Sequence, residues 1–401
     1  MIKKLLVSIA LITIFASNSI TCNATDAVIE STTVLGPVTN PSRSLSRDGG
    51  SSIKLGSKIL WMFGDTLFNP ASVDGTQLRS NTAALATTTS PYSLTEPLDA
   101  NNAPYQFIPF DNTEQTYNDN ASDKARDRYI LWPNLAFNTS PTDGLVFYTR
   151  LKSTPDGPSG YIWSDDSLGA AEITADSTTA SNRTDNIFAD PDPIYKPILL
   201  KDNVAYFTHC TINFLEYDCA LAKVSIGSIL NRNSYEFWNG TAWVSDINSA
   251  AYSFRNLNGA VSWNEYLQKY VNIYKIGFGH SLRMTTADSL TGTWSNYTEI
   301  YDNVDQINTL YVHPELFTEY GRNMIITYTD LGGGGVEAIQ ISFQQTESPI
   351  DSTEIPGVPN SGILLQPPKL LLYIIGFICI ISSVYLIRRH TSFDRRLKSK
   401  K

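Results

Sequence analysis

Acidic residues beside short apolar runs are the first candidates for chemistry in this sequence. Asp48 stands in SRDGG just before one apolar run, and Asp65 stands in GDT just after the next. Asp190 and Asp192 lie in ADPDPIY, and Glu315 lies in YVHPEL. Two carboxyl groups held close together can act as a general acid and a general base, because one can give a proton while the other accepts one. The fold must therefore bring residues from distant parts of the chain to one place.

Each of these acids also has a structural interpretation. Asp48 is followed by two glycines, which is equally typical of a plain turn. For Asp65, before a threonine at the end of an apolar run, we favour a role in holding a hairpin end. The prolines beside Asp190 and Asp192 suit the entry to a strand, so one of these two carboxylates can serve free backbone amides while the other faces the site.

Histidine and glycine patterns indicate no metal or phosphate site. His313 and Glu315 are alternate residues of an extended segment, so their side chains are expected on one face. His209, His280 and His313 lack the spacing of zinc ligands. The four glycines at 332–335 lack the lysine and the following helix of a phosphate loop, so they indicate a hairpin turn.

The middle of the chain has the pattern of an all-β domain. Short alternating runs such as LVFYTRLK and NMIITYTDL are separated by turn clusters such as DGG and LKDN, without a long run at helical spacing. A loose repeat, in which a polar start leads into two strands, recurs near residues 47–68, 131–151, 190–210, 256–278 and 313–330. Five repeats predict a five-bladed β-propeller, whose inner strands surround a channel. The polar stretch 97–128 is expected to be a long loop or a lid.

The two ends of the chain have the patterns of membrane targeting. Residues 1–24 resemble a signal peptide, and the charge-free apolar run 370–387 predicts one transmembrane helix. The basic tail 388–401 indicates the cytoplasmic side. We therefore expect the propeller, residues 34–345, to lie outside the cell or in the secretory lumen. It would be held by a Ser- and Pro-rich stalk, 346–369, on a single-pass type I protein of the plasma membrane or a secretory-pathway membrane.

Charge limits the class of partner. The chain has a formal net charge of −9, and seven of its basic residues lie in the tail against one Asp. Without that tail and the two N-terminal lysines, the charge of residues 5–387 is −17. Such a surface repels nucleic acid and anionic lipid. A neutral or basic partner, such as an uncharged glycan, fits better.

Cysteines and sequons agree with a secretory route. Cys210 and Cys219 remain as a pair once the cysteines of the two apolar ends are set aside, and they predict a disulfide across a strand hairpin. Five Asn-X-Ser/Thr sequons are candidate glycosylation sites: Asn120, Asn138, Asn182, Asn239 and Asn296.

Several motifs together resemble a known family. SRDGG followed by LWMFGDT, then ADPDPIY, and YVHPEL followed by IITYTD resemble a five-bladed propeller family long catalogued as a domain of unknown function, whose mycobacterial members are endo-D-arabinanases. More distantly they resemble the arabinanase and β-xylosidase clan of glycoside hydrolases. The phrase SLRMTTADSLTGTWS resembles a late-blade strand and turn of glycan-active propellers. The resemblance covers most of 39–343.

This resemblance implies roles for particular residues. Asp48 would be the general base or nucleophile, Asp192 would tune its pKa, and Glu315 would be the general acid. Substrate binding would fall to Arg47, Asp190, His313 and Trp132, with Trp61 and Trp263 as further stacking faces. No cofactor is evident, although the clan allows a cation such as calcium in the channel.

Two functions from different classes follow. The first is a cell-surface glycoside hydrolase that acts on extracellular or cell-wall polysaccharide of the arabinan type. The second is a propeller that binds glycans or proteins without catalysis. Fold alone does not separate them; the placement of two facing carboxylates does.

Overall fold

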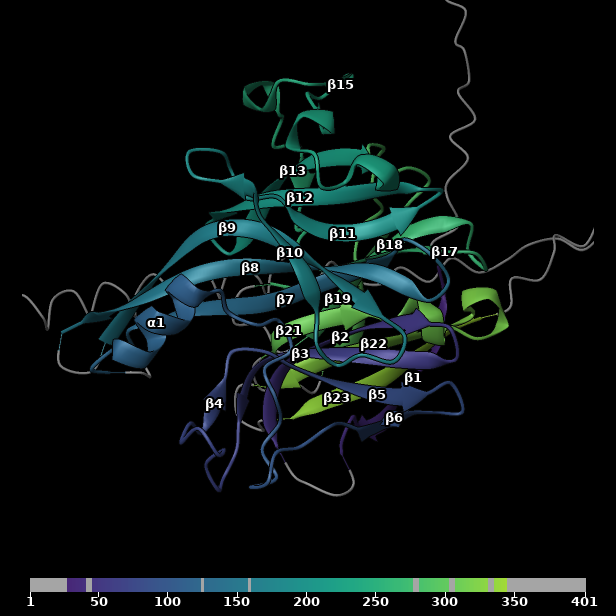
Figure 1. Cartoon of the computed structure of the whole chain (residues 1–401). Coiled ribbons are helices and arrows are strands. Elements are labelled where there is room, and N and C mark those ends of the chain that lie inside the picture. The colour runs from purple at the N-terminus through teal and green to yellow at the C-terminus, as the bar shows by residue number, and fades with distance from the viewer. Residues whose placement is uncertain are drawn as a thin grey trace, which may run out of the picture. The chain divides into compact units, whose positions relative to one another are not determined.

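A computed structural model describes residues 27–40, 45–123, 126–157, 160–276, 281–302, 307–330 and 335–344. These ranges belong to one compact unit, Met1–Gln345. In this unit the strands form five antiparallel sheets that follow one another along the chain (Figure 1). The fold is a five-bladed β-propeller, which confirms the predicted fold class and the number of blades.

Each blade is one of these sheets. Blade 1 contains β2 (Ser46–Leu55), β3 (Lys58–Leu67), β4 (Leu78–Arg79), β5 (Thr82–Thr87) and β6 (Ser90–Thr95). Blade 2 contains β7 (Arg128–Asn138), β8 (Asp143–Asp156), β9 (Gly160–Thr174) and β10 (Ser181–Ala189). Blade 3 contains β11 (Lys196–Lys201), β12 (Val204–Asn213), β13 (Glu216–Ser225), β14 (Glu236–Trp238), β15 (Trp243–Val244) and β16 (Phe254–Arg255). Blade 4 contains β17 (Ala260–Asn264), β18 (Lys269–Lys275), β19 (Ser281–Ala287) and β20 (Thr298–Asp302). Blade 5 contains β21 (Ile307–Val312), β22 (Asn323–Asp330), β23 (Val336–Phe343) and the N-terminal strand β1 (Ile29–Pro37).

Helices are short in this part of the chain. They are α1 (Asn112–Asn120) and the 3₁₀ turns η1 (Ile226–Ser228), η2 (Arg232–Ser234), η3 (Ile247–Ser249), η4 (Pro314–Leu316) and η5 (Glu319–Gly321). Within the described ranges, no helix has the length and apolar character needed to cross a membrane. The predicted signal peptide, stalk, transmembrane helix and tail all lie outside those ranges.

The ring of blades closes through the N-terminus. Strands β2, β7, β11, β17 and β21 are the innermost of their sheets and are neighbours around the ring. Strand β1 pairs antiparallel with β23, at the outer edge of the last blade. The chain start therefore supplies the fourth strand of blade 5, which ties the two ends of the propeller together.

Tight turns set the register within the blades. Gly56 and Ser57 connect β2 to β3, with Leu55 opposite Lys58 and Gly56 at a positive φ of 58°. Asp202 and Asn203 join β11 to β12, both with positive φ. Two-residue turns of this kind match the twist of an antiparallel pair, and Gly, Asn and Asp tolerate the left-handed backbone they need.

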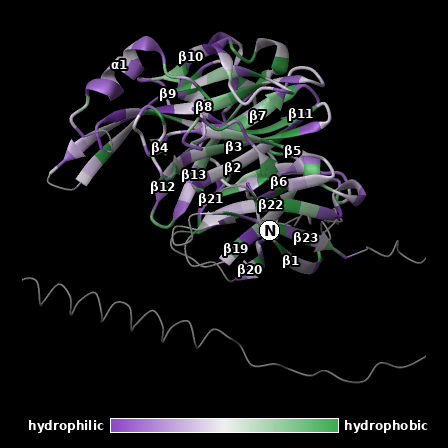
Figure 2. Ribbon diagram, turned by 60° about the horizontal axis from the view of Figure 1, so that its bottom comes forward, coloured by the Kyte–Doolittle hydropathy of each residue, from purple (hydrophilic) through white to green (hydrophobic). Residues whose placement is uncertain are grey.

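Apolar side chains fill the space between neighbouring blades. The cluster between blades 2 and 3 is largely aromatic and includes Phe147, Phe207 and Phe237, all fully buried. Figure 2 shows the same division, with apolar residues concentrated in the strands and a hydrophilic α1. Each blade thus buries both faces against its neighbours, and the polar residues are left for the channel and the ends.

The segment predicted as a loop or lid, 97–128, is instead packed against blades 1 and 2. Phe107 and Ile108 are fully buried in the cluster between these blades. Helix α1 begins with a capping box, in which Asp111 accepts from the Glu114 amide at 2.8 Å and Glu114 accepts from the Asp111 amide at 3.0 Å. This helix was not predicted from the sequence, because α1 is hydrophilic almost throughout.

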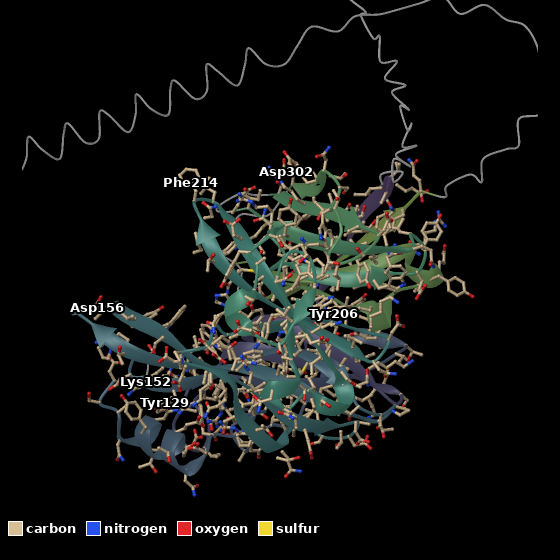
Figure 3. The ribbon with its side chains drawn as sticks, turned by 90° about the horizontal axis from the view of Figure 1, so that it is seen from above. Tyr129, Lys152, Asp156, Tyr206, Phe214 and Asp302 are labelled. Carbon is tan, nitrogen blue, oxygen red and sulfur yellow. A yellow bond between two sulfur atoms is a disulfide. The ribbon has the colours of Figure 1, made fainter. Side chains whose placement is uncertain are left out.

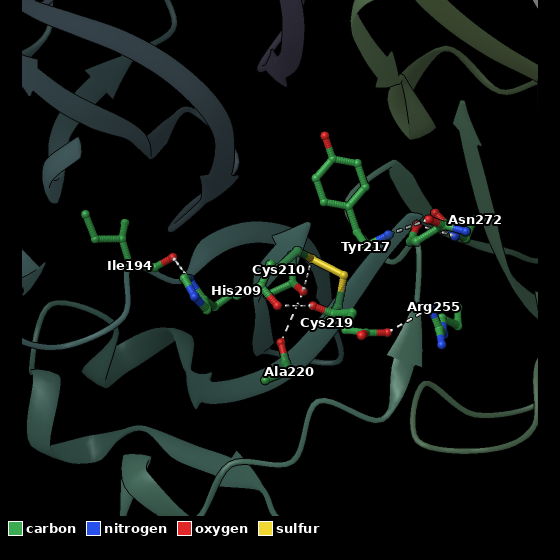
Figure 4. The surroundings of a disulfide bond; sticks show 12 residues. Ile194, His209, Cys210, Tyr217, Cys219, Ala220, Arg255 and Asn272 are labelled. Atoms are coloured by element: carbon green, nitrogen blue, oxygen red, sulfur yellow. Dashed lines mark hydrogen bonds and ion pairs between the residues drawn. A yellow bond between two sulfur atoms is a disulfide. The ribbon is translucent and has the colours of Figure 1, made fainter. Parts of the chain in front are cut away.

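The predicted disulfide is confirmed, and the sequon asparagines are exposed or half-buried. Cys210 and Cys219 are bonded across the β12–β13 hairpin, which confirms their pairing (Figure 4). Its tip ends at Phe214, exposed by 90%, and both this tip and the β8–β9 tip at Asp156 project from the body in Figure 3. Of the sequons, Asn239 is half-buried, and the exposed ones are Asn120, Asn138, Asn182 and Asn296.

Candidate active site

Asp48 lies near the start of the innermost strand of blade 1, at an irregularity in the pairing of β2 with β3. Its carboxylate accepts a hydrogen bond from Asn308 Nδ2 at 3.1 Å and another from the backbone amide of Asp65. The carboxylate also lies over Gly64, where a Cβ atom would be 2.6 Å from Asp48 Oδ1. Glycine is therefore required at position 64 for the carboxylate to lie here.

Asp65, on strand β3, lies beside Asp48 of strand β2. Its Oδ2 accepts from Arg128 Nη2 at 3.2 Å, and its Oδ1 accepts from Trp132 Nε1 at 3.2 Å. Arg128 and Trp132 both come from β7, so this carboxylate joins blade 1 to blade 2. The buried Nε of Arg128 has no hydrogen-bond partner among the described residues.

The two carboxyl groups differ in their electrostatics. Burial raises the pKa of Asp48 to about 6, and the neighbouring charge of Asp65 adds to the rise. Burial also raises the pKa of Asp65, but the Arg128 charge and the bonds from Trp132 and Arg128 oppose the rise. A proton shared by this pair is therefore held preferentially on Asp48, while Asp65 has the cation that stabilises its ionised form.

A cavity of about 880 Å³ is lined in part by Asn308, the residue that bonds Asp48. It is lined by inner-strand residues of blades 3, 4 and 5, by Asn134 of blade 2 and by the tip of the β12–β13 hairpin. Asn308 and Tyr311 of β21 connect it to Asp48. Asn308 bonds the carboxylate, while burial and the charge of Asp48 raise the pKa of the Tyr311 hydroxyl. Asn308 therefore links the Asp48 carboxylate to a space large enough for a small sugar, and neither carboxylate itself lines that space.

His313 and Glu315 lie at the other end of the inner strands. Strands β2 and β21 run in the same direction, because Thr309 bonds Gly49 while His313 bonds Ser52. Asp48 is near the start of β2, whereas His313 and Glu315 follow the end of β21. The predicted fifth repeat began at His313, one strand too late, so the structure does not bring Glu315 to Asp48.

His313 is a structural tie between blades 5 and 1. Its ring is 0% exposed, with Nδ1 2.6 Å from Ser52 Oγ and Nε2 2.8 Å from Thr327 Oγ1. Ser52 Oγ also donates to Glu315, and the His313 ring packs 4.9 Å from that of Trp61. Both ring nitrogens are occupied, and the predicted substrate contact is replaced by a closed network.

The other predicted polar residues are paired elsewhere. Asp192 accepts from Arg232 Nη2 at 2.8 Å, and Arg232 packs on two rings between blades 2 and 3, so Asp192 is not placed beside Asp48. Asp190 is exposed and does not line the cavity. Arg47 is buried, pairs with Glu96 and packs on Phe63, so it points away from the cavity.

Of the three tryptophans predicted to stack on sugar, Trp132 alone reaches the carboxylates. Trp61 is fully buried and donates to the Pro91 carbonyl at 2.8 Å. Trp263 packs edge-on against Tyr270, with the Lys201 ammonium 4.6 Å from its ring centroid. Trp132 is half-buried and bonds Asp65.

A channel cation does not fit the residues present. No group of three or more His, Cys, Asp or Glu residues in the described ranges could hold a metal ion. The cavity lining instead includes Lys196 and Lys275, and burial lowers the pKa of Lys275. Calcium prefers six to eight oxygen ligands, several of them carboxylates, so no step of the chemistry is assigned to it.

Comparisons with known proteins address the family and the fold. A family described as a domain of unknown function (DUF4185) matches residues 176–331, a range that includes His313 and Glu315 but not Asp48 or Asp65. No curated protein matches the chain.

Several solved structures are similar to this chain at low sequence identity. A protein from Bacteroides ovatus, whose hydrolase designation is provisional, has a TM-score of 0.54 at 14% identity and covers 75% of this chain and 87% of its own. An exo-β-1,3-galactanase from Phanerochaete chrysosporium has a TM-score of 0.46 at 13% identity. The match covers 79% of this chain and 67% of the galactanase. An α-L-arabinofuranosidase from Coprinopsis cinerea has a TM-score of 0.44 at 10% identity, covering 79% and 97%.

The predicted resemblance to a propeller family catalogued as a domain of unknown function is therefore confirmed over residues 176–331, and the Bacteroides ovatus protein shares the fold of the propeller.

Proposed function

We propose that this propeller hydrolyses glycosidic bonds with Asp48 and Asp65. The observation that carries the proposal is the pair itself: two neighbouring, half-buried carboxyl groups, one with a pKa of about 6 and one held by Arg128, linked through Asn308 to a cavity of about 880 Å³. Shifted carboxyl groups in a cleft are typical of sites that transfer protons. Hydrolysis of a sugar acetal needs one carboxyl in each protonation state.

The electrostatics assign the two roles. Asp48, the carboxyl that keeps its proton to higher pH, donates it to the leaving glycosidic oxygen as the bond to the anomeric carbon breaks. Asp65, ionised and oriented by Arg128 and Trp132, removes a proton from the attacking water or attacks the anomeric carbon itself. Water supplies the hydroxyl at the anomeric carbon of one product, and its remaining proton passes through Asp65 to Asp48, which gave its own proton to the other product. Tyr311 and Asn308 adjoin Asp48 and orient it.

This assignment replaces three roles implied by the resemblance. Asp48 is the general acid, and not the general base or nucleophile, because it is the carboxyl that keeps its proton to higher pH. Asp65, and not Asp192, is the neighbouring acid that raises the pKa of Asp48. Glu315, the acid implied by the resemblance, is bonded to Ser52 at the far end of β2.

The proposed substrate is an extracellular or cell-wall polysaccharide of the arabinan type. Support comes from the resemblance and from the amide, hydroxyl and aromatic groups of the cavity lining, which suit sugar hydroxyls and lie there together with Lys196 and Lys275. We also propose a cell-surface location with the propeller outside. The apolar runs of the sequence and the Cys210–Cys219 disulfide, which suits an oxidising compartment, support it. The accessible sequons remain candidates for glycosylation.

A second candidate is a glycan-binding propeller without catalysis, and one observation favours it. Asp65 is neutralised by Arg128, as expected of an acid kept for structure. In that case Asp48 would orient sugar hydroxyls and transfer no proton.

The test is release of reducing sugar from arabinan, arabinoxylan, β-1,3-galactan and β-1,3-glucan by the purified protein. Asp48→Asn and Asp65→Asn serve as matched controls, because each removes one carboxylate and keeps the shape of the side chain. Release from one polymer that both substitutions abolish supports the hydrolase. A folded wild-type protein that binds a polymer without release supports the second candidate.

A further inference from the structure

The β8–β9 hairpin of blade 2 presents an exposed pair of aromatic rings outside the cavity. Tyr161 is 49% exposed and Trp163 is 48% exposed. They are alternate residues of β9, so they lie on one face of the strand. Their ring centroids are 5.2 Å apart with planes inclined by 31°. Large exposed rings gathered on one face indicate a contact surface.

This pair is continuous with the carboxylate site. Trp163 packs edge-on against Trp132, with centroids 5.1 Å apart, and Trp132 Nε1 bonds Asp65. The strand register agrees, because Ser153 of β8 stands opposite Arg128 on one side and opposite Trp163 on the other. One face of blade 2 therefore leads from Tyr161 through Trp163 and Trp132 to Asp65.

The opposite face of the same hairpin is covered at Lys152 of β8. Lys152, the neighbour of Ser153, lies with its ammonium 4.4 Å from the Tyr117 ring of α1 and 5.4 Å from the Tyr129 ring. Figure 3 shows Lys152 and Tyr129 together beside this helix. Helix α1 thus supports the hairpin from behind, which fixes the position of the exposed rings in front.

We propose that Tyr161 and Trp163 form a sugar-stacking subsite that guides a neutral polysaccharide chain to Asp48 and Asp65. This inference rests on the proposed function and adds that the substrate is a polymer held outside the cavity. Flat rings on a supported strand offer apolar faces to the C–H faces of sugars while their edges stay in water. The Tyr161–Trp163 centroid spacing of 5.2 Å, with planes inclined by 31°, suits two consecutive sugar rings, and the edge-on Trp132 connects this pair to Asp65.

The continuity of the exposed rings with Asp65 favours a polysaccharide over a protein as the partner. The row of rings ends at a carboxylate with its arginine, so whatever lies on the rings must also extend towards the reacting groups. A chain of sugars can do so, because each unit presents both an apolar face and hydroxyl groups for Asp65 and Arg128.

The test is native affinity electrophoresis in gels that contain linear arabinan, arabinoxylan, β-1,3-galactan or β-1,3-glucan. The Asp48→Asn protein is used so that the polymer stays intact. Trp163→Ala should raise the dissociation constant for the retarding polymer about tenfold, the loss expected for one stacked ring. Trp163→Phe should recover most of the affinity, because it keeps an aromatic face.

Ile162→Ala is the matched control. Ile162 is an exposed neighbour, 56% accessible, whose side chain lies on the opposite face of β9, and its removal should leave binding unchanged. The subsite is refuted if no polymer retards the parent protein, if Trp163→Ala binds as well as the parent, or if Ile162→Ala weakens binding equally.

These outcomes separate the subsite from the hydrolase. If Trp163 is needed for retardation but the wild-type protein releases no sugar from the retarding polymer, the subsite stands and the hydrolase is refuted. Release by the wild-type protein with undiminished binding by Trp163→Ala refutes the subsite alone.

Discussion

Two polar clusters stand at opposite ends of the innermost strand of blade 1, and they use acidic residues in opposite ways. At one end, Asp48 and Asp65 lie together beside a cavity, and burial raises the pKa of both. At the other end, His313 is fully buried with partners on both ring nitrogens, and Ser52 links it to Glu315.

The difference separates a candidate for chemistry from a structural tie. In the His313 cluster, hydrogen bonds connect side chains of blades 1 and 5, so the bonds stabilise the closure of the ring. In the Asp48 pair, two like charges are kept close and partly desolvated, which opposes stability. A fold retains such a pair when the groups have another use.

The substitution Asp48→Asn tests most directly whether the Asp48–Asp65 pair takes part in the chemistry. We expect hydrolysis to fall by roughly 10²–10⁴-fold, the contribution of one general acid, because an amide cannot donate the proton. The measurement is the rate of sugar release at pH 6 on the polymer that the wild type degrades. Folding should be retained, since the change removes a buried charge; a variant with full activity would exclude Asp48 from the chemistry.

His313→Ala should lower the stability of the protein and leave the hydrolytic chemistry in place. Removing the ring leaves a cavity beside Trp61 and takes a partner from both Ser52 and Thr327, so the free energy of unfolding should fall by about 2–4 kcal/mol. Urea unfolding followed by tryptophan fluorescence measures the loss. Tyr320→Ala, at a surface residue 86% exposed, is the control and should be neutral. A stable variant that fails to hydrolyse would place His313 in the reaction instead.

The Asp48–Asp65 pair could have been predicted more fully from the sequence than it was. The Gly56–Ser57 turn fixes the β2–β3 register, with Leu55 opposite Lys58 and Arg47 opposite Thr66. Counting outward from this turn puts Asp48 opposite Asp65. The hairpin alone therefore pairs the two acids, and the interpretation of Asp65 as a mere turn residue did not use that count.

Counting residues from a turn could not have placed Asn308 and Tyr311 at the site. Asn308 and Tyr311 meet Asp48 across the closure of blade 5 on blade 1, about 260 residues along the chain, and one strand pattern does not fix which residues of two blades meet. The role of Glu315 was misplaced for a related reason. A strand and the turn after it have similar apolar patterns, so the start of the last inner strand was set at His313 instead of Ile307.

The dependence of stability on pH sharpens the comparison at Asp48. Its folded pKa of about 6 lies above the ordinary value of 3.8. The contribution of its protonated form is therefore fully present below pH 3.8 and is lost as pH rises through 6. Between pH 4 and pH 7 the wild type should lose up to about 3 kcal/mol of unfolding free energy relative to Asp48→Asn. Urea unfolding of both proteins at the two pH values measures this difference, and parallel profiles would contradict a raised pKa.

Glu315→Gln should have the smallest effect. The amide oxygen can still accept from Ser52, so the free energy of unfolding should fall by about 1 kcal/mol or less. Sugar release should stay within about twofold of the wild type, because a general acid in use would be worth far more. The same assay as for Asp48→Asn measures it, with Asp48→Asn as the inactive reference. If Glu315→Gln instead lost activity by 10²-fold or more, the two ends of the strand would both serve the reaction. The acid would then be Glu315, as the family resemblance implies, and the structural interpretation of the His313 cluster would be wrong.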